Sequence, residues 1–187
     1  PALLEWIKKM FNHAEKKQWY ETYHAMDIHG VISKPDYRKS GEEFQINYYP
    51  FAKETLQFLT KERPDMILFI MTSSYPKEIE SYMKQFEKDN IFFKYINENP
   101  EITDLKGNFG CYDKKPYFNS YWEDKAGFRP DIDWLPIYEY FLNSEYKPDP
   151  SWSFKTVETY HKKEYPKIDG TISSNLDGKC ESCNEMK

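Results

Sequence analysis

The sequence predicts an α/β protein with a mainly parallel, Rossmann-like sheet in an open three-layer sandwich with little or no cap domain. Three observations lead to this class. Short apolar runs alternate with stretches whose apolar residues recur at helical spacing. The most apolar run, residues 66–74, opens with six consecutive apolar residues, as is typical of a strand covered on both faces. Strands that alternate with helices favour a parallel sheet with helices on both sides.

The elements are expected in a regular order along the chain. Residues 2–19 form an amphipathic helix, and residues 23–32 contain a short buried strand. A loop over 33–49 leads to a helix over 50–63, with Pro50 in its first turn. Around the most apolar run the same patterns predict helices over 77–88, 133–143 and 152–165 and strands over 92–97 and 117–122.

We expect one α/β core with an extension at each end. The core covers residues 21–150, the N-terminal amphipathic helix lies within 1–20, and residues 151–187 form a C-terminal extension and tail. The loop before the second helix has about 16 residues, which is too short for an independent cap domain. The tail allows a protein partner to bind it.

Composition and charge exclude some classes of function. A net charge of −5 gives no general attraction to phosphate backbones, so nucleic acid is not favoured as a partner, although a local patch would permit it. No stretch reaches the ~18 apolar residues that a membrane helix needs, and the first residues lack the pattern of a signal peptide. We therefore expect a cytoplasmic protein without a membrane partner.

The three cysteines, Cys111, Cys180 and Cys183, are too few for a disulfide framework. Cys180 and Cys183 have the spacing of half a zinc site, but no second Cys or His pair follows them. Free thiols in an ordinary tail are therefore favoured over a metal or redox role.

Ionisable and hydroxyl side chains follow the predicted strands, at the edge where parallel sheets bind ligands. Singly, such residues are most often turn acids, helix caps or solvated charges. Their gathering at the ends of three strands favours a functional site. In chain order they are Asp27, His29, Thr72, Ser73, Ser74, Glu123 and Asp124, and Lys114 and Lys115 lie just upstream of the last of these strands.

The four segments that contain these residues resemble the motifs of the haloacid dehalogenase-like hydrolases, which are mostly magnesium-dependent phosphatases. The segments are "MDIHGVI", "IMTSS", "DKKPYF" and "YWEDKAGF", and the resemblance covers roughly residues 24–134. The first motif is an Asp-x-His variant, because family members usually carry a second Asp where His29 stands. The acidic segment also looks somewhat like that of the family's nucleotidases.

The resemblance implies a role for each segment. Asp27 would attack phosphorus and form an aspartyl-phosphate that water then hydrolyses. Thr72, or else Ser73, would bind a phosphoryl oxygen. Lys115, or else Lys114, would neutralise charge on the transferring oxygens. Ser73, Lys114 and Gly30 are the candidate substrate-binding residues.

Magnesium is the cofactor that the resemblance implies. Its protein ligands would be Asp27, the backbone carbonyl of His29, and Glu123 or Asp124, with waters completing the shell. The cation would offset the repulsion between a carboxylate nucleophile and a phosphate dianion.

His29 allows three interpretations. With an ordinary pKa near ~6.5, it could protonate the leaving oxygen and later deprotonate the water, which predicts an acid-shifted activity optimum. It could also mark a site that binds without turnover, or be a turn residue before Gly30.

The leading hypothesis is a magnesium-dependent phosphohydrolase acting on a phosphomonoester, such as a nucleotide or a phosphorylated end. The alternative is a catalytically degenerate binding or assembly module of the same fold. A phosphotransferase that shares the intermediate is a weaker third candidate.

Overall fold

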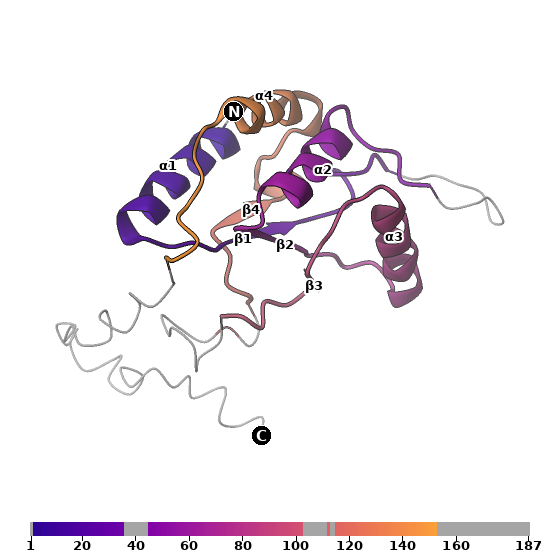
Figure 1. Ribbon diagram of the computed structural model, residues 1–187. Helices are drawn as coiled ribbons and strands as arrows, with labels where there is room; N and C mark the ends of the chain where they lie inside the picture. The colour runs from indigo at the N-terminus through magenta and orange to yellow at the C-terminus, as the bar shows by residue number, and fades with distance from the viewer. Residues whose placement is uncertain (1, 36–44, 103–111, 113–114, 153–187) are drawn as a thin grey trace, which may run out of the picture.

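The computed structural model describes residues 2–35, 45–102, 112 and 115–152. The elements in chain order are α1 (Ala2–Lys17), β1 (Thr22–Met26), α2 (Ala52–Glu62), β2 (Met66–Ile70), α3 (Pro76–Lys88), β3 (Tyr95–Ile96), β4 (Ser120–Trp122), the 3-10 turn η1 (Asp124–Ala126) and α4 (Pro130–Asn143). The strands form an all-parallel sheet in the order β3-β2-β1-β4 (Figure 1). The predicted α/β class and parallel sheet are confirmed.

The predicted strands are longer than the observed ones. β3 has two residues instead of the six expected, and β4 begins at Ser120 rather than at residue 117. Both strands lie at the edges of the sheet, where each has one neighbour to pair with. The central strand β1 is buried along its whole length, and the segment after Met26 leaves the sheet.

Three helices begin at positions that differ from the prediction, α3 by a single residue. α4 begins at Pro130 rather than at residue 133, because proline suits the first helical position. Pro50 precedes α2 instead of lying in its first turn, since Phe51 between them has a left-handed φ of 66°. The predicted helix over 152–165 lies outside the described residues, as do Cys111, Cys180, Cys183 and Lys114.

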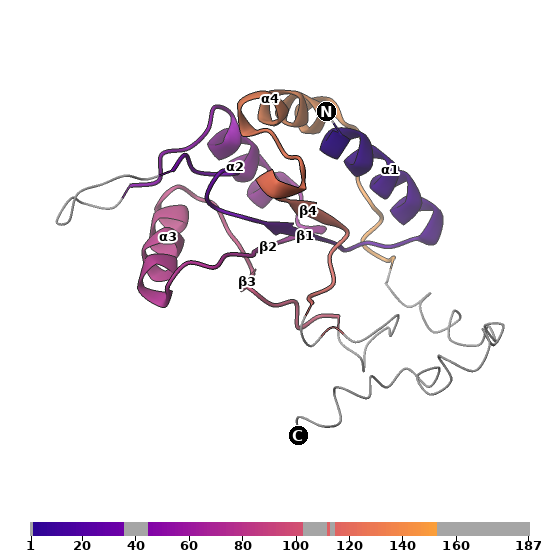
Figure 2. The same ribbon diagram turned by 180° about the vertical axis from the view of Figure 1, so that it is seen from behind.

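One face of the sheet packs against all four helices. Figures 1 and 2 show α1, α2 and α4 together over this side of the strands. The hydrophobic cluster that they share with the sheet includes Ile7 and Phe11 of α1, Leu56 of α2, Phe86 of α3, Ile137 of α4, and Met26, Leu68, Ile70 and Trp122 of the strands. This face holds the main core of the protein.

The other face of the sheet carries a smaller cluster. Tyr23, Ala25 and Phe69 pack there with Ile102, and partly buried aromatic residues surround them. Within the described ranges these contacts come from the segment between β3 and β4, which contributes no helix. A helical layer on this face is therefore not confirmed.

Buried polar side chains join β1 to β4. The His24 ring hydrogen-bonds with the Thr22 hydroxyl through Nε2 (2.8 Å) and with the Ser120 hydroxyl through Nδ1 (2.6 Å). The Trp122 indole N–H donates to the same Ser120 oxygen. Burial lowers the pKa of His24 to about 3, so the ring is neutral and satisfied. These bonds stabilise the pairing of the two strands whose ends carry acidic residues.

The amphipathic α1 is confirmed, although it ends at Lys17 instead of residue 19. In the part of the chain that the structure describes, no helix is long and apolar enough to cross a membrane.

Candidate functional site

The register of β1 and β4 places Asp27 and Glu123 side by side. Met26 pairs with Trp122 in parallel, and the Asp27 backbone N–H donates to the Trp122 carbonyl (3.0 Å). Asp27 and Glu123 are therefore the first residues beyond two neighbouring strands. From β1 the chain passes to β2 on one side, while β4 lies on the other side. Ligands of open parallel sheets bind at such a switch point.

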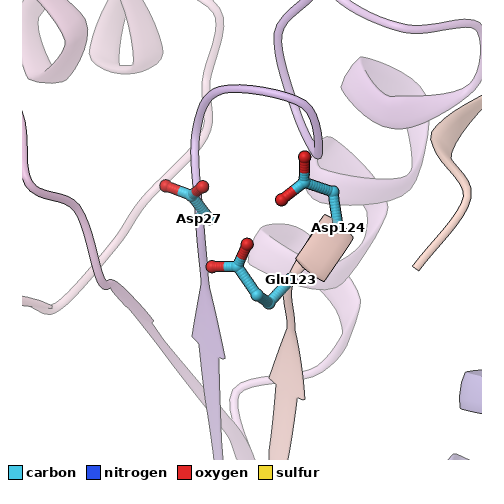
Figure 3. A group of neighbouring side chains, drawn as sticks. All are labelled: Asp27, Glu123 and Asp124. Atoms are coloured by element: carbon cyan, nitrogen blue, oxygen red, sulfur yellow. The ribbon is translucent and has the colours of Figure 1, made fainter. Parts of the chain in front are cut away.

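Three carboxylates converge at this point, from Asp27, Glu123 and Asp124. One oxygen from each lies within 4.8 Å of the others. Figure 3 shows Asp27 beyond the end of β1 and the other two beyond β4, with their carboxyl groups grouped around one space. The structure thus brings together the predicted nucleophile and both candidate acidic metal ligands.

Each of the three carboxylates accepts at least one hydrogen bond from the protein. The Tyr121 hydroxyl donates to Glu123 Oε2 (2.8 Å), and the Lys125 backbone N–H donates to Asp124 Oδ1 (2.8 Å) and, more weakly, to Glu123 Oε1 (3.2 Å). The Ile28 backbone N–H donates to Asp27 Oδ1 (2.8 Å). Among the described residues, no donor reaches Asp27 Oδ2. One oxygen of the Asp27 carboxylate therefore accepts a backbone hydrogen bond, while the other has no donor within the described ranges.

The acidic groups have opposite electrostatic environments. Burial raises the pKa of Asp27, and the nearby Glu123 raises it further. The contact with Glu123, followed by the backbone N–H and ammonium of Lys125, lowers the pKa of Asp124. Of these two acids, Asp27 is the one whose charged form the protein disfavours.

Lys125 is the site residue that the sequence reasoning did not select. Its Nζ lies 3.4 Å from Asp124 Oδ1 and 3.7 Å from Glu123 Oε1, and its side chain is 82% exposed. Its charge also lowers the pKa of Asp27. Its closeness to Glu123 and Asp124 in the chain was the signal, but a lysine in that position is usually only a solvated charge.

Gly30 lies against Asp124. The turn after β1 closes with hydrogen bonds from the Ser33 N–H to the Ile28 carbonyl and from the Gly30 N–H to the Ser33 carbonyl (2.9 Å each). Gly30 has a φ of +76°, and a Cβ there would lie 2.7 Å from Asp124 Oδ2. Glycine favours this backbone conformation, and a methyl group at this position would push the Asp124 carboxylate aside. Its predicted contact with substrate stays a prediction.

His29 lies on the same turn and contacts α3. Its Nε2 is 2.7 Å from the Tyr82 hydroxyl, and the two rings meet edge to face with their centroids 5.3 Å apart. Its Nδ1 has no hydrogen-bond partner among the described residues. The side chain is not part of the group of three carboxylates, and the predicted role of its backbone carbonyl stays a prediction.

The hydroxyl residues after β2 form a local turn. Thr72 Oγ1 is 3.0 Å from Ser74 Oγ and accepts from the Ser74 N–H (3.2 Å). The Asn97 side chain accepts from the Thr72 N–H (2.7 Å) and donates to the Thr72 carbonyl (2.9 Å). Ser73 is exposed. The Thr72 hydroxyl is therefore held at the end of β2, the neighbour of β1.

The residue that precedes α3 is Tyr75, not one of the hydroxyl residues. The Glu78 carboxylate accepts from the Tyr75 N–H (2.9 Å) at this helix start. A serine or threonine just before a helix often caps it, but none of Thr72, Ser73 and Ser74 is the N-cap of α3.

Lys115 is not placed beside the carboxylates by any described contact. Its side chain is exposed, and its Nζ lies 5.9 Å from the centre of the Phe118 ring. Phe118 packs with the smaller hydrophobic cluster, on the face of the sheet opposite the main core. Lys125 is therefore the lysine that the described contacts join to the acidic group.

The three carboxylates suit a hard divalent cation. Magnesium prefers oxygen ligands and keeps several waters, so it needs only one or two carboxylates from the protein. The charge of Glu123 also opposes ionisation of Asp27, and a cation between them would offset this repulsion. The donor set therefore fits magnesium, with Asp27 and either Glu123 or Asp124 as ligands.

We predict opposite effects on stability for Asp27→Asn and Asp124→Asn in metal-free buffer. The folded protein raises the pKa of Asp27 above its unfolded value of 3.8, so stability is highest below pH 3.8, where the carboxyl is protonated in both states. As the pH rises through the folded pKa, the carboxyl must ionise in an unfavourable environment, and that stability is lost. Asp27→Asn should therefore raise the free energy of unfolding at neutral pH, and the gain should vanish in acid.

For Asp124 the sign is reversed. Its lowered pKa contributes stability above pH 3.8 that is lost as pH falls, so Asp124→Asn should reduce stability at neutral pH. Solvent screening keeps this second effect below about 1 kcal/mol. Urea unfolding at several pH values measures both, and destabilisation by Asp27→Asn at neutral pH would contradict the account.

Comparisons with known proteins give a distant structural likeness. No protein-family model matches the chain, and no curated protein sequence matches it. A solved structure of a conserved protein from Bacteroides thetaiotaomicron matches with a TM-score of 0.48 and 23% sequence identity. The match covers 65% of this chain and 90% of that chain. A likeness at this level carries no inference about function.

Proposed function

We propose that this chain is a magnesium-dependent phosphohydrolase of the haloacid dehalogenase-like type, acting on a phosphomonoester. The observation that carries the proposal is the convergence of Asp27, Glu123 and Asp124 where β1 and β4 end. The four motifs in chain order add support, because they predicted an acid at both strand ends. A nucleotide or a phosphorylated end is the substrate class that we favour, and a three-layer core with little cap is part of the same proposal.

Asp27 is the proposed nucleophile. Its Oδ2 has no donor among the described residues, so this oxygen can form a bond to phosphorus as the bond from phosphorus to the leaving oxygen breaks. The Ile28 N–H fixes the orientation of the carboxylate through Oδ1. The product of this step is an aspartyl-phosphate, which water hydrolyses to regenerate the carboxylate.

Magnesium, held by Asp27 with Glu123 or Asp124 and the His29 carbonyl as proposed ligands, would supply positive charge between nucleophile and phosphate. The chain itself offers few positive charges here. Lys125 is the cation joined to the acidic group by described contacts, and it is largely exposed to solvent. This charge balance supports a bound cation as part of the active form.

His29 is the proposed general acid and base. It would donate a proton to the leaving oxygen in the first step and take one from the attacking water in the second. The Tyr82 hydroxyl fixes the ring through Nε2, which leaves Nδ1 for this exchange. Thr72 would donate its hydroxyl to a phosphoryl oxygen, and Lys114 or Lys115 would balance charge on the transferring group.

The first prediction from this proposal concerns turnover. With magnesium and a generic substrate such as p-nitrophenyl phosphate, the wild type should release phosphate, and Asp27→Asn should reduce kcat by roughly 1,000-fold or more because it removes the nucleophile. Glu80→Gln is a matched control, since Glu80 is an exposed acid on α3 that forms an ion pair with Lys84, away from the three carboxylates.

Trapping completes the turnover test. Mass spectrometry of the acid-quenched wild type should place the phosphoryl group on Asp27. Turnover that survives Asp27→Asn would contradict the enzyme proposal. Absence of turnover in both proteins, with magnesium still bound, would favour the alternative of a degenerate binding or assembly module.

The second prediction uses two glycines with positive φ. Gly30→Ala pushes a methyl group against Asp124 Oδ2, whereas a Cβ at Gly127 would meet nothing within 4 Å. Both variants acquire backbone strain, but only Gly30→Ala displaces an acidic group. We expect Gly30→Ala to weaken magnesium binding about tenfold, and Gly127→Ala to leave it within about twofold.

Thermal unfolding with and without magnesium measures this difference. Saturation at 100 times the dissociation constant stabilises the folded protein by about 2.7 kcal/mol, so a tenfold weaker site is readily detected. Equal magnesium shifts in the two glycine variants would show that the position of Asp124 does not matter for the cation.

A further inference from the structure

Lys125 lies at the edge of the acidic group and contacts two of its three members. The ammonium is 3.4 Å from Asp124 Oδ1 and 3.7 Å from Glu123 Oε1. The Glu123 side chain is only 12% exposed, whereas Lys125 is 82% exposed. Glu123 is therefore held by the fold, the Asp124 side chain is 38% exposed, and the more exposed lysine side chain can move away from both.

The backbone of Lys125 has a separate role from its side chain. Its N–H donates to Asp124 Oδ1 and Glu123 Oε1, and these bonds help to fix both carboxylates beside η1. Removal of the ammonium therefore leaves these bonds intact. A substitution of the side chain tests charge alone.

An ammonium and a divalent cation cannot both neutralise these carboxylates without repelling each other. Two positive charges this close repel each other even in water, and the repulsion doubles when one of them is divalent. Lysine carries a compact charge on a flexible stem, so it can withdraw into solvent. Binding of magnesium would therefore require the ammonium to leave.

We propose that Lys125 is a built-in competitor for the cation site: its ammonium neutralises Glu123 and Asp124 when no metal is bound, and it is displaced when magnesium binds. This inference rests on the proposed function, because it assumes that the three carboxylates hold the cation. It goes beyond that function by giving the site an internal control of metal affinity. In this role Lys125 changes the affinity for the metal and does not contact the substrate.

The test is a magnesium titration by calorimetry on the full chain. Lys125→Gln should bind magnesium about 3- to 10-fold more tightly than the wild type, because the competing charge is gone while solvent screening limits the effect. Lys125→Arg, which keeps the charge, should bind like the wild type. The gain in Lys125→Gln should shrink as the salt concentration rises.

Lys84→Gln is the matched control. Lys84 is also exposed and pairs with one acid, Glu80, at 2.6 Å on α3. Its substitution should leave magnesium affinity unchanged, which separates a local effect from the change in net charge. Without metal, Lys125→Gln should also unfold at a lower temperature than the wild type, and added magnesium should remove the difference.

The results separate failure of the competitor role of Lys125 from failure of the proposed cation site. If Asp27→Asn weakens magnesium binding but Lys125→Gln binds as the wild type does or more weakly, the competitor role is overturned and the cation site stands. If Asp27→Asn and the wild type bind magnesium equally, or if neither binds it, the proposed site fails and the inference fails with it. Tighter binding by Lys125→Gln alone, absent in Lys125→Arg and Lys84→Gln, supports it.

Discussion

The parallel pairing of β1 with β4 is the constraint on which the site depends. It makes Asp27 and Glu123 neighbours, since each is the first residue after its paired strand. The buried hydrogen bond between His24 and Ser120 stabilises this pairing from within the core. A shift in register by one residue would turn alternate side chains to the opposite face and separate the two acids. The closeness of Asp27 and Glu123 therefore depends on the register of β1 and β4 more than on the loops around them.

The same constraint creates a cost for the folded protein. Three carboxylates are held close together, and burial disfavours the charged form of Asp27. Three neighbours reduce the repulsion in part: the backbone N–H of Lys125, its ammonium, and the Tyr121 hydroxyl. A cluster of uncompensated charge at the carboxyl end of a sheet is a common feature of functional sites, where stability is lower because function requires it. A cation that binds only the folded state would recover that stability.

Sequence patterns predicted the class of fold and the acids of the site for a physical reason. Apolar runs locate buried strands, and acids directly after them must gather at one edge of a parallel sheet. The partners of Gly30 and His29 could not be predicted in this way, because the contacts with Asp124 and Tyr82 depend on tertiary packing. Lys125 was overlooked because a lysine beside two acids in the sequence is usually a solvated charge, and its contacts with them depend on the 3-10 turn η1. The layer of helices expected on the second face is the part of the fold that the described residues do not confirm.

The central claim is that one cation and one phosphoryl group meet at Asp27. A crystal structure with magnesium and a beryllium trifluoride mimic of the phosphoryl group tests it most directly. The account predicts the mimic bonded to an oxygen of Asp27 and magnesium bound by that carboxylate together with Glu123 or Asp124, with the Lys125 ammonium moved away. Magnesium bound elsewhere, or a mimic that avoids Asp27 while magnesium occupies the acidic group, would contradict it.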